Sequence, residues 1–149
     1  MEIKTNCYAA VDIGASSGRV VIGEVTPRGA IELTEIHRFD NIQKRSGGHD
    51  CWDVDMLFRE TVAGLAKCKE GYAPKTVGID TWAVDFVLLD AEDNMLGDAV
   101  AYRDERTSGM YAVADAIVSP DEVYRRTGIQ RQPFNTIYQL LALQREHPE

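Results

Sequence analysis

Residues 12–19, Asp-Ile-Gly-Ala-Ser-Ser-Gly-Arg, combine the residue types that bind phosphate groups. The two glycines allow backbone N–H groups to approach a ligand closely, and the two serines add hydroxyl donors. Arg19 adds a planar guanidinium that matches phosphate oxygens, and Asp12 is a candidate ligand for a hydrated Mg²⁺ beside them. The same pattern is compatible with an ordinary hairpin turn that carries a surface Asp and a surface Arg.

The spacing excludes two other phosphate-binding motifs. No Gly-Lys-Ser or Gly-Lys-Thr follows Gly14, and the stretch does not open a helix, as a G-x-G-x-x-G turn should. Instead, short apolar runs at residues 7–11 and 20–22 flank it. Two apolar runs joined by a Gly- and Ser-rich link predict an antiparallel hairpin with the phosphate-binding residues at its turn.

A second group of candidate residues follows the strand predicted at residues 76–80. Trp82 offers an aromatic face for the C–H surface of a sugar, and Asp85 offers a carboxylate for sugar hydroxyl groups. The alternative is that Trp82 belongs to the core and Asp85 caps a turn. The alternating charges at residues 103–107 favour a solvated surface over a site.

The elements before residue 81 predict how these residues are positioned. A third strand is expected over residues 31–39, a polar loop over 40–50, and a helix that begins after Asp53 and ends before Gly71. Because a helix usually connects parallel neighbours, we expect the strand at 76–80 to lie parallel to the first. Asp12 and Asp80 would then emerge at carboxyl ends of strands, where open α/β sheets bind ligands.

The rest of the chain predicts a strand near residues 86–89, a turn at 91–94, a returning strand at 100–102, and three helices. The helices are expected over residues 106–118, 121–126 and 137–143, with Asn135 or Thr136 as the last cap. The chain stops soon after this amphipathic helix, which predicts an N-terminal portion of a longer protein.

Composition excludes several classes of function. The 149 residues carry a net charge of −8 and a pI near 4.9, which argues against binding nucleic acid or anionic membrane. Neither a signal peptide nor a transmembrane run is visible, so a cytoplasmic protein is expected. The sequence has an odd number of cysteines and no C-x-x-C pair, which predicts that Cys7, Cys51 and Cys68 are reduced, structural thiols.

Six ordered blocks resemble the FGGY carbohydrate kinases, and together they run over essentially the whole chain. They are VDIGASSGRV at residues 11–20, EIHRF at 35–39, WDVD at 52–55, GIDTWAVDFVLLD at 78–90, AYRD at 101–104 and QPFNTIYQL at 132–140. The resemblance is greatest to the members that act on L-rhamnulose. It implies an α/β fold of the actin-like ATPase (ribonuclease H-like) type, with an antiparallel three-strand start, a crossover helix and a mixed sheet. Residues 1–149 would form an incomplete N-terminal domain, and the second domain would be absent.

The resemblance also implies an activity: transfer of the γ-phosphoryl group of ATP to the 1-hydroxyl of L-rhamnulose, with Mg²⁺. The residues that match the ATP-binding turn are Ala15, Ser16, Ser17, Gly18 and Arg19, with Asp12 near Mg²⁺ through water. Ala83 stands at a sugar-contacting position where the pattern of the L-rhamnulose enzymes has Gly, and Trp82 and Asp85 flank it as walls of the sugar pocket.

The same resemblance places the general base, an Asp in a His-Asp-Thr block, beyond Glu149, so this chain would hold no catalytic residue. It would need the missing C-terminal domain and show little or no turnover alone. If it were active alone, Asp80 or Asp85 would be the suspected base. Two alternatives stay open: a kinase for another ketose or polyol, such as fuculose or xylulose, or a non-catalytic sugar- or nucleotide-binding module.

Overall fold

The computed structural model describes residues 3–148, which fall into two compact units. The first unit comprises residues 3–43 and 52–83, and the second comprises residues 44–51 and 84–148. The described helices do not include one with the length and apolar character needed to cross a membrane.

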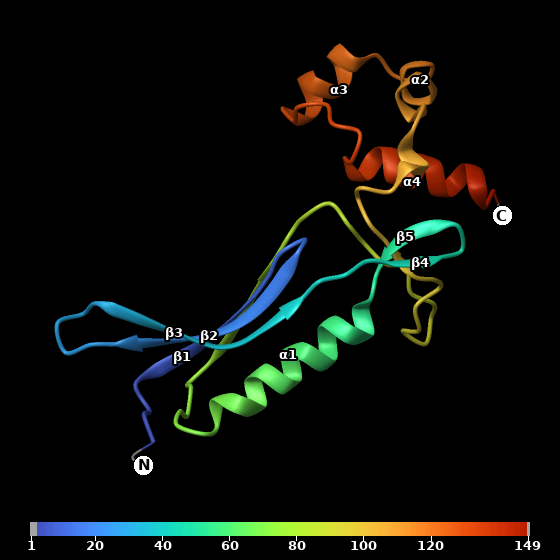
Figure 1. Ribbon diagram of the computed structural model, residues 1–149. Helices are drawn as coiled ribbons and strands as arrows, with labels where there is room; N and C mark the ends of the chain where they lie inside the picture. Colours follow the sequence, from blue (N-terminus) through green and yellow to red (C-terminus); the bar gives the residue numbers. More distant parts are fainter. Residues whose placement is uncertain (1–2, 149) are drawn as a thin grey trace. The chain divides into compact units, whose positions relative to one another are not determined.

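The first unit is a four-stranded mixed sheet with one helix on one face (Figure 1). Its strands lie in the order β3-β2-β1-β6, with β1 at Cys7–Ile13, β2 at Ser17–Val25, β3 at Ile31–Asp40 and β6 at Val77–Thr81. The first three strands pair antiparallel, and β6 pairs parallel to β1. The predicted antiparallel start and parallel fourth strand are therefore confirmed.

The crossover helix α1 (Val54–Cys68) packs closely against this sheet. Asp53 caps it as predicted, because its carboxylate accepts a hydrogen bond from the Met56 N–H at 3.0 Å. A Cβ atom at Gly64 would lie 2.4 Å from the Val20 Cγ2 atom, so this glycine permits the close approach of helix and strand. The core between them consists of side chains from β1, β2 and α1, namely Cys7, Ala9, Val11, Val20, Ile22 and Cys68.

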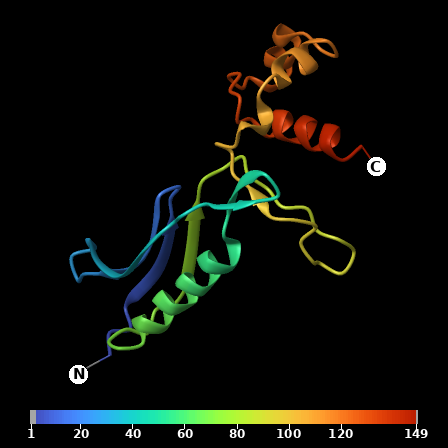
Figure 2. The same cartoon turned by 45° about the vertical axis from the view of Figure 1, so that its right-hand side comes forward.

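The second unit combines a small sheet with short helices (Figure 2). Its strands β4 (Lys44–Ser46), β5 (His49–Trp52) and β7 (Ala99–Val100) pair in that order. The 3-10 turn η1 covers Glu105–Thr107, and the helices are α2 (Met110–Asp115), α3 (Pro120–Thr127) and α4 (Thr136–Glu146). Gly128, at φ 65°, ends α3, and Asn135 precedes α4 at the predicted cap position.

Three local predictions were wrong. Residues 40–50 are not all loop, since β4 and β5 form a hairpin there. Residues 86–89 form no strand; only a single bridge joins Leu89 to Met95, because no neighbouring segment pairs along the run. The helix expected over 106–118 begins at Met110, because Gly109 adopts φ 78° and interrupts it.

The charged segment at residues 103–107 is only partly the solvated surface that its alternating charges predict, since Arg103 and Glu105 are exposed but the other three residues are not. Asp104 and Thr107 are buried, and Arg106 is half-buried. The Asp104 carboxylate accepts hydrogen bonds from the backbone N–H groups of Asp50 and Arg106 and from the His49 ring. Burial would raise the pKa of the Asp104 carboxyl, but these three donors outweigh it and lower the pKa below its usual range.

All three cysteines are free and buried, as the sequence predicts. Burial raises the pKa of the Cys51 and Cys68 thiols. A thiol with a raised pKa and no exposed surface is a poor nucleophile, so these cysteines act as small apolar residues of the core.

Candidate phosphate-binding turn and neighbouring residues

The turn between β1 and β2 is narrow and presents backbone groups. Ile13 and Gly18 form the last pair of the two strands. One residue further toward the turn, the Gly14 N–H donates to the Ser17 carbonyl oxygen at 2.9 Å and closes it. Among residues 3–148, the N–H groups of Ala15 and Ser16 donate to no protein acceptor. Two adjacent N–H groups that donate to no protein acceptor on a tight turn can donate to an anion.

Gly18 has a second use that its sequence pattern does not reveal. A Cβ atom at this position would lie 2.1 Å from the Cζ atom of Phe39, which is buried on β3. The Phe39 ring therefore covers the backbone of β2 at the root of the turn, and only glycine leaves room for it.

Asp12 and Arg19 lie beside each other on β1 and β2 and form an ion pair. The Arg19 Nε atom donates to the Asp12 Oδ2 atom at 2.9 Å, and the Nη2 atom lies 2.8 Å from the same oxygen. Both side chains are about half exposed, so the pair contributes little stability and can be exchanged for ligand contacts.

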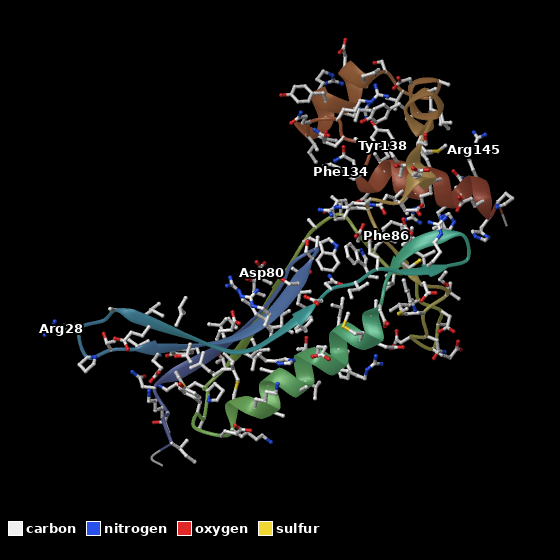
Figure 3. The ribbon with its side chains drawn as sticks, viewed as in Figure 1. Arg28, Asp80, Phe86, Phe134, Tyr138 and Arg145 are labelled. Atoms are coloured by element: carbon white, nitrogen blue, oxygen red, sulfur yellow. The ribbon has the colours of Figure 1, made fainter. Side chains whose placement is uncertain are left out.

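The pair belongs to a row of charges across the sheet. Four charged residues lie directly opposite one another on neighbouring strands, in the order Arg38 on β3, Arg19 on β2, Asp12 on β1 and Asp80 on β6. Two cations therefore adjoin two carboxylates. Asp80 lies at the end of the sheet opposite Arg28, which marks the β2–β3 turn (Figure 3). Arg38 is itself paired with the Glu35 carboxylate, whose pKa the guanidinium lowers through its hydrogen bonds.

The donor chemistry of this row fits Mg²⁺ bound together with phosphates. Within residues 3–148, no group of three or more His, Cys, Asp or Glu side chains could hold a metal ion by itself. Mg²⁺ at phosphate sites usually needs only one or two carboxylates, because phosphate oxygens and water complete its coordination. Asp12, at the carboxyl end of β1, supplies such a carboxylate.

Trp82 packs at a tilted angle against a second tryptophan that sequence reasoning did not select. Its ring centroid lies 4.3 Å from that of Trp52, whose side chain is only 2 % exposed. One side of Trp82 is thus anchored in the first unit, as the core interpretation requires, and Trp82 is still partly exposed. Ala83, the last residue of that unit, is exposed.

Asp85 lies in the second unit and is engaged by protein donors. Its carboxylate accepts from the Tyr102 N–H and from the Gln139 Nε2 atom, each at 3.2 Å. The preceding Val84 adopts φ 72°, a left-handed conformation that a β-branched residue rarely takes. Its carbonyl oxygen accepts from the Thr136 Oγ1 atom at 2.8 Å and from Gln139 at 3.2 Å, and these bonds hold the strained backbone.

Sequence reasoning missed two buried amides. Gln139, on α4, is fully buried, and besides Val84 and Asp85 it contacts the Phe134 carbonyl oxygen and the Arg106 guanidinium. Figure 3 shows Phe134 and Tyr138 close to this part of α4. Asn41 lies against the turn at residues 14–17, where it binds the Gly14 and Ser16 carbonyl oxygens. Gln139 falls inside the resembling block at 132–140, which was the only signal, and no pattern marked Asn41.

A sequence profile described as the N-terminal domain of the FGGY family of carbohydrate kinases matches residues 7–149. The chain is 54% identical over 145 residues to a rhamnulokinase of Halalkalibacterium halodurans, covering 97% of this chain and 31% of the relative. It is 49% identical over 144 residues to a rhamnulokinase of Oceanobacillus iheyensis, covering 96% and 30%. The chain thus spans about a third of the length of these curated relatives.

A solved structure with the same fold is a xylulose kinase from Rhodospirillum rubrum. It matches with a TM-score of 0.77 at 18% sequence identity, over 95% of this chain and 30% of that one. At this identity the likeness shows the fold alone, which is the predicted actin-like ATPase arrangement of a mixed sheet and helices.

Proposed function

Because this chain belongs to the FGGY family of carbohydrate kinases, through its N-terminal domain, we propose that it binds the phosphate groups of ATP in an ATP-dependent sugar kinase. The turn between β1 and β2 carries the proposal. It presents unpaired N–H groups beside two serines, an arginine and a carboxylate at the end of a strand. Asp12, Ser16, Ser17 and Arg19 are the residues proposed to contact nucleotide or metal.

Phosphoryl transfer of this kind depends mainly on positioning and on neutralising negative charge. Mg²⁺ bound near Asp12 would supply positive charge to the phosphate oxygens. When nucleotide binds, the Arg19 guanidinium leaves the Asp12 carboxylate and donates to phosphate oxygens instead. The weak, half-exposed ion pair makes this exchange inexpensive.

The proposed substrate is L-rhamnulose, phosphorylated at its 1-hydroxyl group. The names of the relatives at about half identity support this choice over fuculose or xylulose. Ala83 and Trp82 are proposed to face the sugar. The catalytic base and the rest of the ATP contacts are proposed to lie in sequence beyond Glu149, so residues 1–149 are an incomplete first domain.

The test is an ADP-release assay with Mg-ATP and L-rhamnulose, L-fuculose or xylulose, on this chain and on the chain extended to the full reading frame. We expect turnover only in the extended protein, fastest with L-rhamnulose. Phosphorylation by the 149 residues alone would instead put the base within them, at Asp80 or Asp85. Sugar binding without turnover in the extended protein would favour a non-catalytic binding module.

The role of Arg19 is tested in the same assay with a matched control. Arg19→Met removes a charged hydrogen-bond donor to phosphate, so KM for ATP should rise about tenfold or more. Arg28→Met alters the same strand pair at its other end, where Figure 3 shows Arg28 at the β2–β3 turn, and should leave KM unchanged. Equal effects of the two variants would remove Arg19 from the phosphate site.

A further inference from the structure

We propose that Asn41 is a positioning residue that holds the turn at residues 14–17 in the shape that receives phosphate. The proposal rests on the function proposed above for that turn. Asn41 follows β3 immediately, and its side chain is 5 % exposed. No sequence pattern selects it, and its importance follows only from its contacts.

Asn41 binds two carbonyl groups of the turn from one side. Its Nδ2 atom donates to the Gly14 carbonyl oxygen at 2.9 Å, and its backbone N–H donates to the Ser16 carbonyl oxygen at 3.0 Å. The two segments are 27 residues apart in the chain, so this contact ties the end of β3 to the hairpin.

These bonds fix the direction of the neighbouring N–H groups. In a trans peptide the C=O and the N–H point in opposite directions. Because the Gly14 carbonyl points toward Asn41, the Ala15 N–H points away from it, and the Ser17 N–H does the same on account of the Ser16 carbonyl. The Asn41 side chain thus determines which face of the Gly14–Ala15 peptide a ligand meets.

The Oδ1 atom of the Asn41 side chain indicates that a contribution to stability does not explain why an asparagine stands here. The Asn41 Oδ1 atom is buried and has no hydrogen-bond donor among residues 3–148. The amide cannot be turned over, because Oδ1 would then face the Gly14 carbonyl oxygen. A buried acceptor without a donor costs about 1–3 kcal/mol, and an apolar side chain would avoid this cost. The asparagine is therefore better explained by its bond to the turn.

The chain offers a matched control in Asn6. Its Nδ2 atom also donates to a backbone carbonyl, that of Val25 at 3.0 Å, where β2 ends far from the turn at residues 14–17. Asn6→Ala therefore removes the same type of amide-to-carbonyl bond from the other end of the β1–β2 hairpin, together with the hydrogen bond that Oδ1 accepts from the Lys75 Nζ atom at 2.9 Å, without touching the turn.

The experiment measures KM for ATP and for the sugar in the extended protein carrying Asn41→Ala, Asn41→Asp or Asn6→Ala. Asn41→Asp keeps the shape of the side chain and replaces the donor by an oxygen, so it stays informative if Asn41→Ala folds poorly. For both Asn41 variants we expect KM for ATP to rise about tenfold, which corresponds to one lost hydrogen bond, with KM for the sugar within about twofold. Asn6→Ala should change neither constant.

A second readout does not depend on activity. Hydrogen exchange of the Gly14 amide, which donates to Ser17 across the turn, should accelerate about tenfold in Asn41→Ala and stay unchanged in Asn6→Ala. If the wild-type protein shows no kinase activity but Gly14 exchange is faster in Asn41→Ala than in the wild type, the kinase proposal fails and the positioning role of Asn41 stands. Unchanged KM for ATP in active Asn41 variants, or unchanged Gly14 exchange, would overturn the inference. A lower Tm with unchanged KM would make Asn41 a stability residue only.

Discussion

Replacing Gly18 by Ala tests the packing at the root of the phosphate turn. The new Cβ atom would lie 2.1, 2.5 and 2.8 Å from three carbon atoms of the Phe39 ring. Ordinary van der Waals contact begins near 3.4 Å, so the buried ring must move by about 1 Å or more. The strand β3, which carries Phe39, must adjust with it.

The expected cost follows from two opposing effects. Overpacking a filled core costs about 1–3 kcal/mol, whereas exchanging Gly for Ala within a strand contributes roughly 0.5–1 kcal/mol in favour of folding. Gly18→Ala should therefore lower the free energy of unfolding by about 1–2 kcal/mol. Gly23→Ala on the same strand is the control, since its Cβ would meet Ile31 at 3.4 Å, and it should be neutral or slightly stabilising.

Urea unfolding followed by tryptophan fluorescence measures this effect, with Trp52 and Trp82 as reporters within the same unit. Phe39→Leu removes the ring atoms that the new Cβ atom would meet, so it should relieve the clash. In that background Gly18→Ala should lower the free energy of unfolding by at least about 1 kcal/mol less than in the wild type. If Gly18→Ala costs nothing, or costs the same with Leu at position 39, the steric argument is wrong.

Three further predictions concern the helix, a buried carboxylate and a strained backbone. Gly64→Ala places a Cβ atom 2.4 Å from the Val20 Cγ2 atom and should destabilise the protein by about 1–2 kcal/mol in urea unfolding, because overpacking outweighs the preference of a helix for Ala over Gly. Gly71→Ala, with no atom within 4 Å of the new Cβ, should not destabilise it, and equal effects would refute the close packing. The lowered pKa of Asp104 means that its ionised form stabilises the fold above pH 3.8, and that this contribution is lost as pH falls through the folded-state pKa. Asp104→Asn should therefore destabilise the protein at pH 7 and progressively less in urea titrations below pH 3.8, and a pH-independent difference would contradict this. Val84 at φ 72° carries a backbone strain of about 1–3 kcal/mol, which Val84→Gly relaxes. This variant should raise KM for the sugar about threefold in the extended protein, while Asp93→Gly, which relaxes a residue at φ 64°, should not. Identical KM values would show that the strain has no role in the proposed sugar site.

Local patterns in the sequence predicted the parts of the fold that depend on neighbours in the chain. The hairpin at residues 7–25 and the helix that begins after Asp53 follow from apolar periodicity, a glycine-rich turn and a capping carboxylate. The parallel pairing of β6 with β1 follows from the crossover helix between them. The same reasoning failed at residues 86–89, because a strand forms only where another segment pairs with it.

The residue types of the phosphate turn, and the family to which the chain belongs, could be read from the sequence alone, because both depend on short blocks of residues in a definite order. Only the tertiary structure shows that Phe39 fills the space above Gly18, and that Asn41 binds the Gly14 carbonyl from 27 residues away. It likewise shows that Asp104 is a buried, hydrogen-bonded carboxylate within a charged segment. Side-chain burial and long-range hydrogen bonds depend on which distant segments pack together, and a local pattern of residue types does not contain that information.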